Sequence, residues 1–397
     1  MRKETQLALS GLVVVAMAYG FARYGYGLFV PVFEREFGLS TEEIGLVSSG
    51  AYAAHLFAMV LTGLLTRKTG PRFPVVAGAV CAAVGMLLIS VARGPLLLLA
   101  GAVLAGTSSG FCWAPFSDAV AILVERERRN RVLSVISTGT AFGLVVAGPV
   151  VLLVSAGGES FGWRYAWVLF SAVALSVALW NLKLLPNEPY DGVGVEKDEK
   201  LNIGWFLCPR SAPLLGQAFS YGLVAAFYYT YAIDFIRQSG FSSEWGPIFW
   251  GLVGVSGIIG VLGGDAVSHF GLRRCLTVCL TILGISVGGL GFSSGFGVLV
   301  VVCALTFGAS YMLVAAFLVV WSGAVFYERP ATGFTAVLIS LAAGSILGPS
   351  LLGVLAGVLS LETAFWCAAA LTVLSTMLRP VSDIRNAAPE KPNVATH

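Results

Sequence analysis

Residues 33–42 read FEREFGLSTE, and residues 235–244 read FIRQSGFSSE. Five of these ten aligned positions are identical, and they pair Phe33, Arg35, Gly38, Ser40 and Glu42 with Phe235, Arg237, Gly240, Ser242 and Glu244. Unrelated apolar helices would share scattered Leu, Val and Ala residues rather than charged and Gly positions. The two stretches therefore predict an internal duplication.

The same alignment continues along both halves of the chain. Its offset drifts only from 202 to 200 residues while it pairs Gly63, Gly70, Arg72 and Gly148-Pro149 with Gly264, Gly271, Arg273 and Gly348-Pro349. The duplication therefore covers most of the sequence.

The composition is that of a membrane protein. The 397 residues are 57% hydrophobic and 11% charged, with a mean hydropathy of +0.86, whereas soluble domains have roughly 25% charged residues. The net charge is +3, and the cations form no basic stripe of the kind that nucleic-acid backbones require. We expect an integral membrane protein with no nucleic-acid partner.

Apolar runs long enough to span a bilayer as helices, about 20 residues each, recur along the whole chain. They start near residues 6, 43, 72, 95, 131, 162, 211, 245, 273, 296, 332 and 361. We predict an all-α membrane protein with 12 transmembrane helices. Each copy has an even number of spans, so the two six-helix bundles should be related by a parallel pseudo-two-fold axis along the membrane normal.

The domain boundaries follow from this pattern. We predict an N-terminal bundle over 1–185, a linker over 186–210, a C-terminal bundle over 211–385 and a disordered tail over 386–397. Within the linker, residues 204–207 (GWFL) are expected to lie along the membrane interface.

Positive residues set the predicted orientation. Apart from Arg23, which lies inside a span, only Arg35, Arg93, Arg164 and Arg237 fall on the side opposite the termini. Because Lys and Arg accumulate on the cytoplasmic side, we predict an inner (plasma) membrane protein with both termini in the cytoplasm.

Two loops resemble a motif of the major facilitator superfamily. Residues 63–72 (GLLTRKTGPR) and 264–274 (GDAVSHFGLRR) keep its glycines and terminal arginines, while Arg67 and Ser268 occupy its acidic position. The resemblance implies a secondary transporter that works by alternating access, with gating loops at Gly63, Gly70, Arg72, Gly264, Gly271 and Arg273. Residues 139–149 also resemble the fifth-span motif of the family's antiporters, so a proton-driven drug or metabolite efflux antiporter is the alternative.

Arg23 is the clearest candidate for substrate binding. A charge at the bilayer centre costs about 2.5–3.5 kcal/mol on insertion scales, so an unneeded one is not expected there. A guanidinium suits a carboxylate, and we therefore predict an anionic substrate. The alternative is that Arg23 anchors its span at the membrane interface. An ion pair between Arg23 and Asp118 would also remove the argument for an anionic substrate.

Further candidates lie on four spans. Gln217, Tyr221, Tyr228 and Tyr231 form a polar, aromatic stripe on one helix face. Tyr26 flanks Arg23. The resembling family lines its cavity from spans one, four, seven and ten, which adds Trp113 and Tyr311.

Three titratable residues are candidates for proton coupling: Asp118, His55 and Asp234. His55 has an ordinary pKa near 6.5, although a lone histidine is more often a packed residue. For Asp234 the alternative is an interfacial pair with Arg237.

No residue pattern points to catalysis or cofactors. The sequence has no phosphate-binding loop, metal-ligand cluster or nucleophile motif, so we expect no enzyme, metal or cofactor. A receptor or membrane-embedded enzyme is the alternative from a different class. The expected partners are a small-molecule substrate and the lipid bilayer, with the chain as a monomer.

Overall fold

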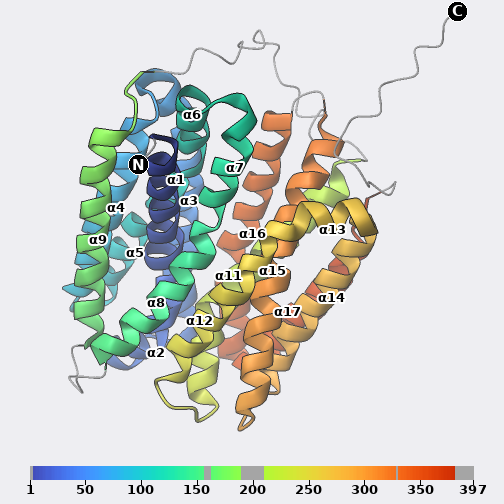
Figure 1. The fold of residues 1–397 in the computed structure, drawn as a ribbon. Coiled ribbons are helices and arrows are strands. Elements are labelled where there is room, and N and C mark those ends of the chain that lie inside the picture. Colours follow the sequence, from blue (N-terminus) through green and yellow to red (C-terminus); the bar gives the residue numbers. More distant parts are fainter. Residues whose placement is uncertain (1–2, 156–161, 189–209, 328–329, 381–397) are drawn as a thin grey trace, which may run out of the picture.

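The computed structural model describes residues 3–155, 162–188, 210–327 and 330–380, and these residues form helices and turns without a strand. Figure 1 shows the first half of the chain as one helical bundle, coloured blue to green, beside a second bundle in yellow to red. The predicted all-α fold with 12 membrane helices in two bundles is confirmed. Most of the predicted linker, including residues 204–207, and the tail over 386–397 lie outside the described residues.

Six spans make the first bundle, and three of them are interrupted. The first span joins α1, η1 and α2; the fourth joins α5 and α6; the fifth joins α7 and α8. The bounds are α1 Lys3–Val15, η1 Ala16–Arg23, α2 Gly25–Phe37, α3 Thr41–Thr69, α4 Arg72–Ser90, α5 Pro95–Gly110, α6 Trp113–Leu123, α7 Arg126–Ser137, α8 Gly139–Ser155 and α9 Gly162–Leu184.

The second bundle repeats this order, with its eighth span built from α12, η2 and α13. The bounds are α11 Ala212–Gln238, α12 Trp245–Gly257, η2 Ile258–Leu262, α13 Gly263–Phe270, α14 Leu272–Gly291, α15 Gly297–Val325, α16 Pro330–Val358 and α17 Leu361–Ser375. Ten helical stretches of the described residues are long and apolar enough to cross a membrane, and α17 is a shorter apolar helix. The tyrosine-rich α11 is 27 residues long.

The duplicated loop forms a helix-ending turn in each half. Gly38 and Gly240 have φ values of +64° and +88°, in the left-handed region that glycine adopts most easily. Ser40 then caps α3: its Oγ accepts a hydrogen bond from the Glu43 amide at 3.2 Å, and the Glu43 carboxylate accepts one from the Ser40 amide at 2.8 Å. This capping box accounts for Ser40 in the first half, whereas α12 begins after Glu244 without a side-chain cap.

The two motif loops also join helices through left-handed glycines. Gly70 and Gly271 have φ values of +72° and +81°, and the Nε of Arg72 donates a hydrogen bond to the Leu185 carbonyl oxygen at 2.6 Å. The predicted gating residues lie at or near these junctions: Gly63, Gly70, Arg72, Gly264, Gly271 and Arg273. Their role in gating stays a prediction.

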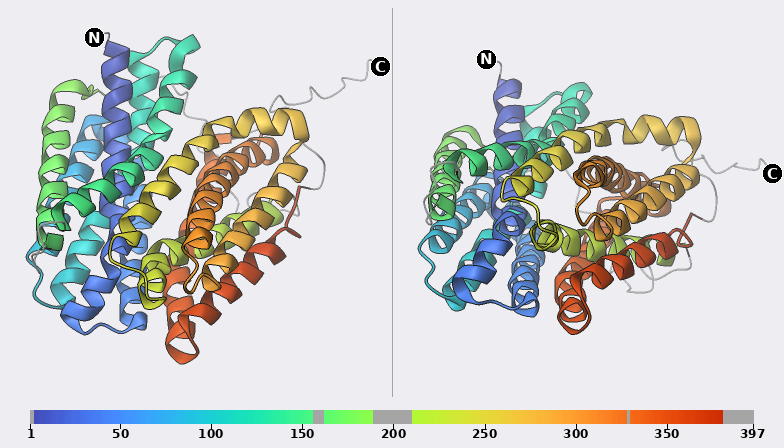
Figure 2. Two further views of the ribbon diagram at one scale, coloured as in Figure 1. Left: turned by 60° about the horizontal axis from the view of Figure 1, so that its bottom comes forward. Right: turned by 90° about the horizontal axis from the view of Figure 1, so that it is seen from below.

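We call the face at which α1 begins the terminal side, and the opposite face, at the bottom of Figure 1, the far side. The bundles meet through contacts of α3 with α16 and of α8 with α12, and Figure 2 shows them side by side from the far side. We call the contacting residues the far-side seam: Gly27, Gly45, Ser48 and Gly148 of the first half with Tyr229, Thr230, Tyr231, Pro247 and Pro349 of the second.

Glycines and hydroxyl groups allow the close approach at this seam. A Cβ on Gly45 would collide with the Pro349 carbonyl oxygen, and one on Gly148 with that of Pro247. The Ser48 and Thr230 hydroxyls share a hydrogen bond of 2.7 Å. Small residues of this kind let helices pack at short distance in a membrane, and the protein is therefore closed on its far side.

Arg164 of α9 links its own span to the ends of α4 and α2 at the far side. Its guanidinium donates to the carbonyl oxygens of Ser90 and Ala92 at 2.8 and 2.7 Å and to the Glu36 carboxylate at 2.9 Å. We expect Arg164→Ala to lower the free energy of unfolding by about 2 kcal/mol, because hydrogen bonds from a charged donor are lost. Thermal unfolding in detergent checks this, with Arg93→Ala at an exposed position as the control; equal midpoints for the two variants would contradict it.

Candidate functional site

Arg23 ends a π-helical stretch in the first span. The amide of Tyr24 donates to the Tyr19 carbonyl oxygen at 2.9 Å, five residues earlier, and η1 continues into α2 after this turn. Such turns are rare and occur frequently at functional sites. Gly20 in the same stretch faces α8, where a Cβ would come within 2.5 Å of the Gly143 backbone.

Three tyrosine rings surround the guanidinium group of Arg23. Its Cζ lies 4.7 Å from the ring centre of Tyr52, 5.3 Å from that of Tyr19 and 5.4 Å from that of Tyr24. Cations within about 6 Å of an aromatic ring are attracted by its face, the more so when water is excluded. The rings thus stabilise the charge without neutralising it.

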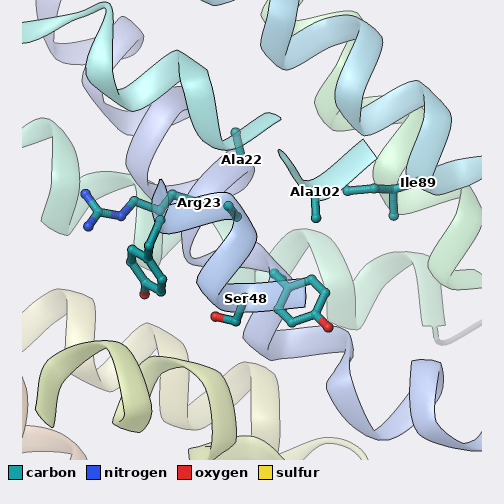
Figure 3. A pocket seen from close by; sticks show the side chains of 8 residues that line it. Ala22, Arg23, Ser48, Ile89 and Ala102 are labelled. Carbon is teal, nitrogen blue, oxygen red and sulfur yellow. The ribbon is translucent and has the colours of Figure 1, made fainter. Parts of the chain in front are cut away.

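No carboxylate of the described residues forms an ion pair with Arg23. Its side chain is 9% exposed, and its Nε has no hydrogen-bond partner. Asp118, the alternative partner, interacts with Arg67 instead. Figure 3 shows the guanidinium directed away from Ile89 and Ala102, which line a small cavity behind the Arg23 backbone.

Tyr24 connects this site to the second half. Its hydroxyl lies 3.0 Å from that of Tyr311, and its ring stacks on Tyr229 with centres 4.1 Å apart. Tyr311 in turn stacks on Tyr221, whose hydroxyl donates to the Tyr311 carbonyl oxygen at 2.7 Å. The predicted residues Arg23, Tyr221 and Tyr311 therefore meet in one aromatic cluster near the middle of the spans.

His55 lies behind Tyr19 in the same region. Its Nδ1 is 2.8 Å from the Ser109 hydroxyl, and its ring meets that of Tyr19 edge to face at 6.2 Å. The side chain is buried and hydrogen-bonded, and its role in proton coupling stays a prediction.

The structure does not bring four other predicted residues onto the Arg23 guanidinium. Tyr26 lines the small cavity, but its hydroxyl donates to the Ile44 carbonyl oxygen at 3.4 Å. Gln217 is fully buried and donates to Ser375 of α17 within its own bundle. Tyr228 stacks on Phe307 at 3.7 Å, and Trp113 begins α6, partly exposed.

Asp234 meets the first half at the far side. Its carboxyl group lies beside that of Glu34 in α2 and accepts a hydrogen bond from the Gln238 amide at 2.8 Å. Arg237 donates to the Phe241 carbonyl oxygen rather than pairing with Asp234. Two carboxyl groups from different halves therefore face each other.

Five contributing residues were not predicted as site residues: Tyr19, Tyr24, Tyr52, Tyr229 and Glu34. Tyr19 and Tyr24 bracket Arg23 in the sequence, so their proximity was detectable. Tyr52, Tyr229 and Glu34 belong to contacts between separate spans, which no local pattern predicts. Within the described residues, no group of three His, Cys, Asp or Glu side chains could hold a metal ion.

Comparisons with known proteins agree with this architecture. The family model of the Major Facilitator Superfamily matches residues 12–343. The purine ribonucleoside efflux pump NepI of Escherichia coli O6:H1 is 28% identical over 306 residues, 73% of this chain and 70% of that protein. Human monocarboxylate transporter 11 is 29% identical over 183 residues, 45% of this chain and 37% of its own length.

Solved structures show the same fold. The nucleoside transporter NupG superposes with a TM-score of 0.76 at 13% identity, over 94% of this chain and 98% of that one. An inward-facing bacterial homolog of the human lysosomal transporter Spinster gives 0.71 at 15% identity, over 95% of each chain.

Proposed function

Because this chain belongs to the Major Facilitator Superfamily, we propose that it is a secondary transporter that carries a small organic anion past Arg23 by alternating access. The bundles over 1–185 and 211–385 rock against each other around a site at mid-depth. With both termini in the cytoplasm, the far side faces outward. The far-side seam then corresponds to an outward-closed state.

The observation that carries this proposal is the unpaired charge of Arg23. Burying a charge is costly unless it is paired, and here tyrosine rings are its electrostatic neighbours. The Nε of Arg23 is left as a buried donor without a partner. An anion entering between the halves would accept from this donor and compensate the charge.

A carboxylate is the anion that fits best. The planar guanidinium can donate two parallel hydrogen bonds to a carboxylate. One of the relatives is named as a monocarboxylate transporter, although this chain spans only 37% of its length. We therefore propose a monocarboxylate as the substrate class.

Matched carboxylate and amide ligands test the proposal. In proteoliposomes we expect counterflow of at least one of pyruvate, hexanoate and benzoate, and none of the corresponding amides, which have a similar shape but no charge. Equal transport of an acid and its amide would remove the role assigned to Arg23.

A nucleoside is the second candidate. The stacked pair of Tyr24 and Tyr229 offers flat surfaces to a base, and one relative is named as a purine ribonucleoside efflux pump. Nucleoside transport would not require the charge of Arg23. Inosine counterflow that survives Arg23→Gln would favour this candidate over the anion.

We propose Asp234 together with Glu34 as the proton site, ahead of His55 and Asp118. Two adjacent carboxyl groups cannot both ionise without repulsion, so the pair retains one proton while the far side is closed. Tyr231, Tyr26 and Glu42 are the other titratable neighbours. Separation of the halves would expose both carboxyl groups to water and release this proton.

We expect Glu34→Gln to flatten the pH dependence of transport, because an amide can donate to Asp234 at any pH. The measurement is counterflow at several external pH values, with Asp118→Asn as the control that keeps the pair. A pH profile unchanged by Glu34→Gln but lost in Asp118→Asn would move the proton site to Asp118.

A further inference from the structure

The surroundings of Arg23 narrow the kind of anion that can bind. Its neighbours are the tyrosines at 19, 24, 52 and 311, so the site offers one cation, flat rings and phenolic hydroxyls. A substrate ammonium group would need a carboxylate partner, and a sugar would need several polar side chains. No carboxylate among the described residues pairs with Arg23, so amino acids and sugars fit poorly.

The rings of Tyr24 and Tyr229 are in direct stacking contact, and they would form a slot for a flat group once the two halves separate. The rings stack with centres 4.1 Å apart and planes 21° apart, and they come from opposite halves. Any movement of the halves that opens the site must separate them. A planar ring between them would restore two stacking contacts, each of which stabilises beyond the area it buries.

Two buried polar atoms in this cluster have no hydrogen-bond partner: the Nε of Arg23 and the hydroxyl of Tyr229. Both side chains are more than nine-tenths buried. Buried donors normally have a hydrogen-bond partner. Arg23 and Tyr229 both contact Tyr24, so the two atoms belong to the same cluster. They mark where a ligand's polar groups would bind.

Resting on the proposed function, we infer that the substrate is an aromatic monocarboxylate without an ammonium group. Its carboxylate binds Arg23, its ring lies between Tyr24 and Tyr229, and a ring hydroxyl, where present, bonds to the Tyr229 hydroxyl. Tyr24 and Tyr229 then determine specificity, and Arg23 determines charge.

Titration calorimetry of the detergent-solubilised full chain tests the inference. We expect benzoate to bind about tenfold more tightly than cyclohexanecarboxylate, which has the same charge and a similar size but a puckered ring; tenfold corresponds to about 1.4 kcal/mol. Phenylalanine should bind more weakly than benzoate because its ammonium finds no partner.

Variants at the slot sharpen the test. Tyr24→Leu should abolish the preference for benzoate, whereas Tyr24→Phe, which keeps the ring, should retain it. Tyr229→Phe should remove any preference for 4-hydroxybenzoate over benzoate without weakening benzoate itself. The ligand comparison on the unmodified protein remains decisive if Tyr24→Leu does not fold.

The outcomes separate this inference from the proposed function. Equal binding of benzoate and cyclohexanecarboxylate, both lost in Arg23→Gln, would overturn the aromatic slot and leave the anion transporter standing. Binding of neither acid, together with binding of inosine, would overturn both.

Discussion

Replacement of Arg23 by Gln is expected to lower carboxylate counterflow about 100-fold, because the substrate's charge then loses its one buried partner. Thermal stability of the empty protein should stay the same or rise, since the variant no longer buries an unpaired charge. Arg23→Lys should retain partial activity, because it keeps the charge but loses the planar fork.

Counterflow in proteoliposomes, normalised to inserted protein, provides the measurement. The combination of lost transport and unchanged unfolding temperature is the informative result, because a residue with only a packing role would lower both. Arg23→Gln protein with carboxylate flux equal to the unmodified protein would disprove the assignment of the site.

The second large effect is expected at the far-side seam. A Cβ on Gly27 would collide with the carbonyl oxygen of Tyr229 in the other half, whereas one on Gly251 in α12 meets only open space. We expect Gly27→Ala to lower transport at least tenfold and Gly251→Ala to leave it unchanged. Overpacking costs about 1–3 kcal/mol, and here that cost falls on the closed state rather than on either bundle.

Labelling can report this shift directly. In a background without the native cysteines, a cysteine at Ser48, buried in the seam, should react slowly with an impermeant maleimide added from the far side. Gly27→Ala should speed the reaction, and Gly251→Ala should not. Equal labelling rates in the two variants would show that the seam tolerates the extra methyl group.

Much of the fold was predictable from local pattern. The 12 predicted runs match the observed spans, and ten of these spans are recognised among the described residues by length and hydropathy alone. The loop shared by Gly38 and Gly240 was predictable for a similar reason, since a left-handed turn requires glycine. The sequence also isolated Arg23, because a charge inside an apolar run is conspicuous.

The composition of the site was harder to predict. Tyr24 was not selected because an α-helical projection places Tyr26, three residues after Arg23, on the face of Arg23. In the structure it is the Tyr24 ring that lies beside the Arg23 guanidinium. Gln217 was assigned to the cavity from its stripe, yet it contacts Ser375, because a helix in a bundle has several neighbours and periodicity does not say which one a face meets. Tyr229 and Glu34 depend on how the halves dock.

The π-helical stretch also bears on how duplicated halves diverge. The span that corresponds to it in the second half, α11, runs as continuous α-helix from Ala212 to Gln238. One inserted residue rotates the preceding part of a helix by about 100° relative to the rest. A single insertion can thus present a new set of side chains to the solute, while the contacts of the far-side seam beyond it stay unchanged. Selectivity can therefore change in one evolutionary step, without changes in the parts of the protein that move during transport.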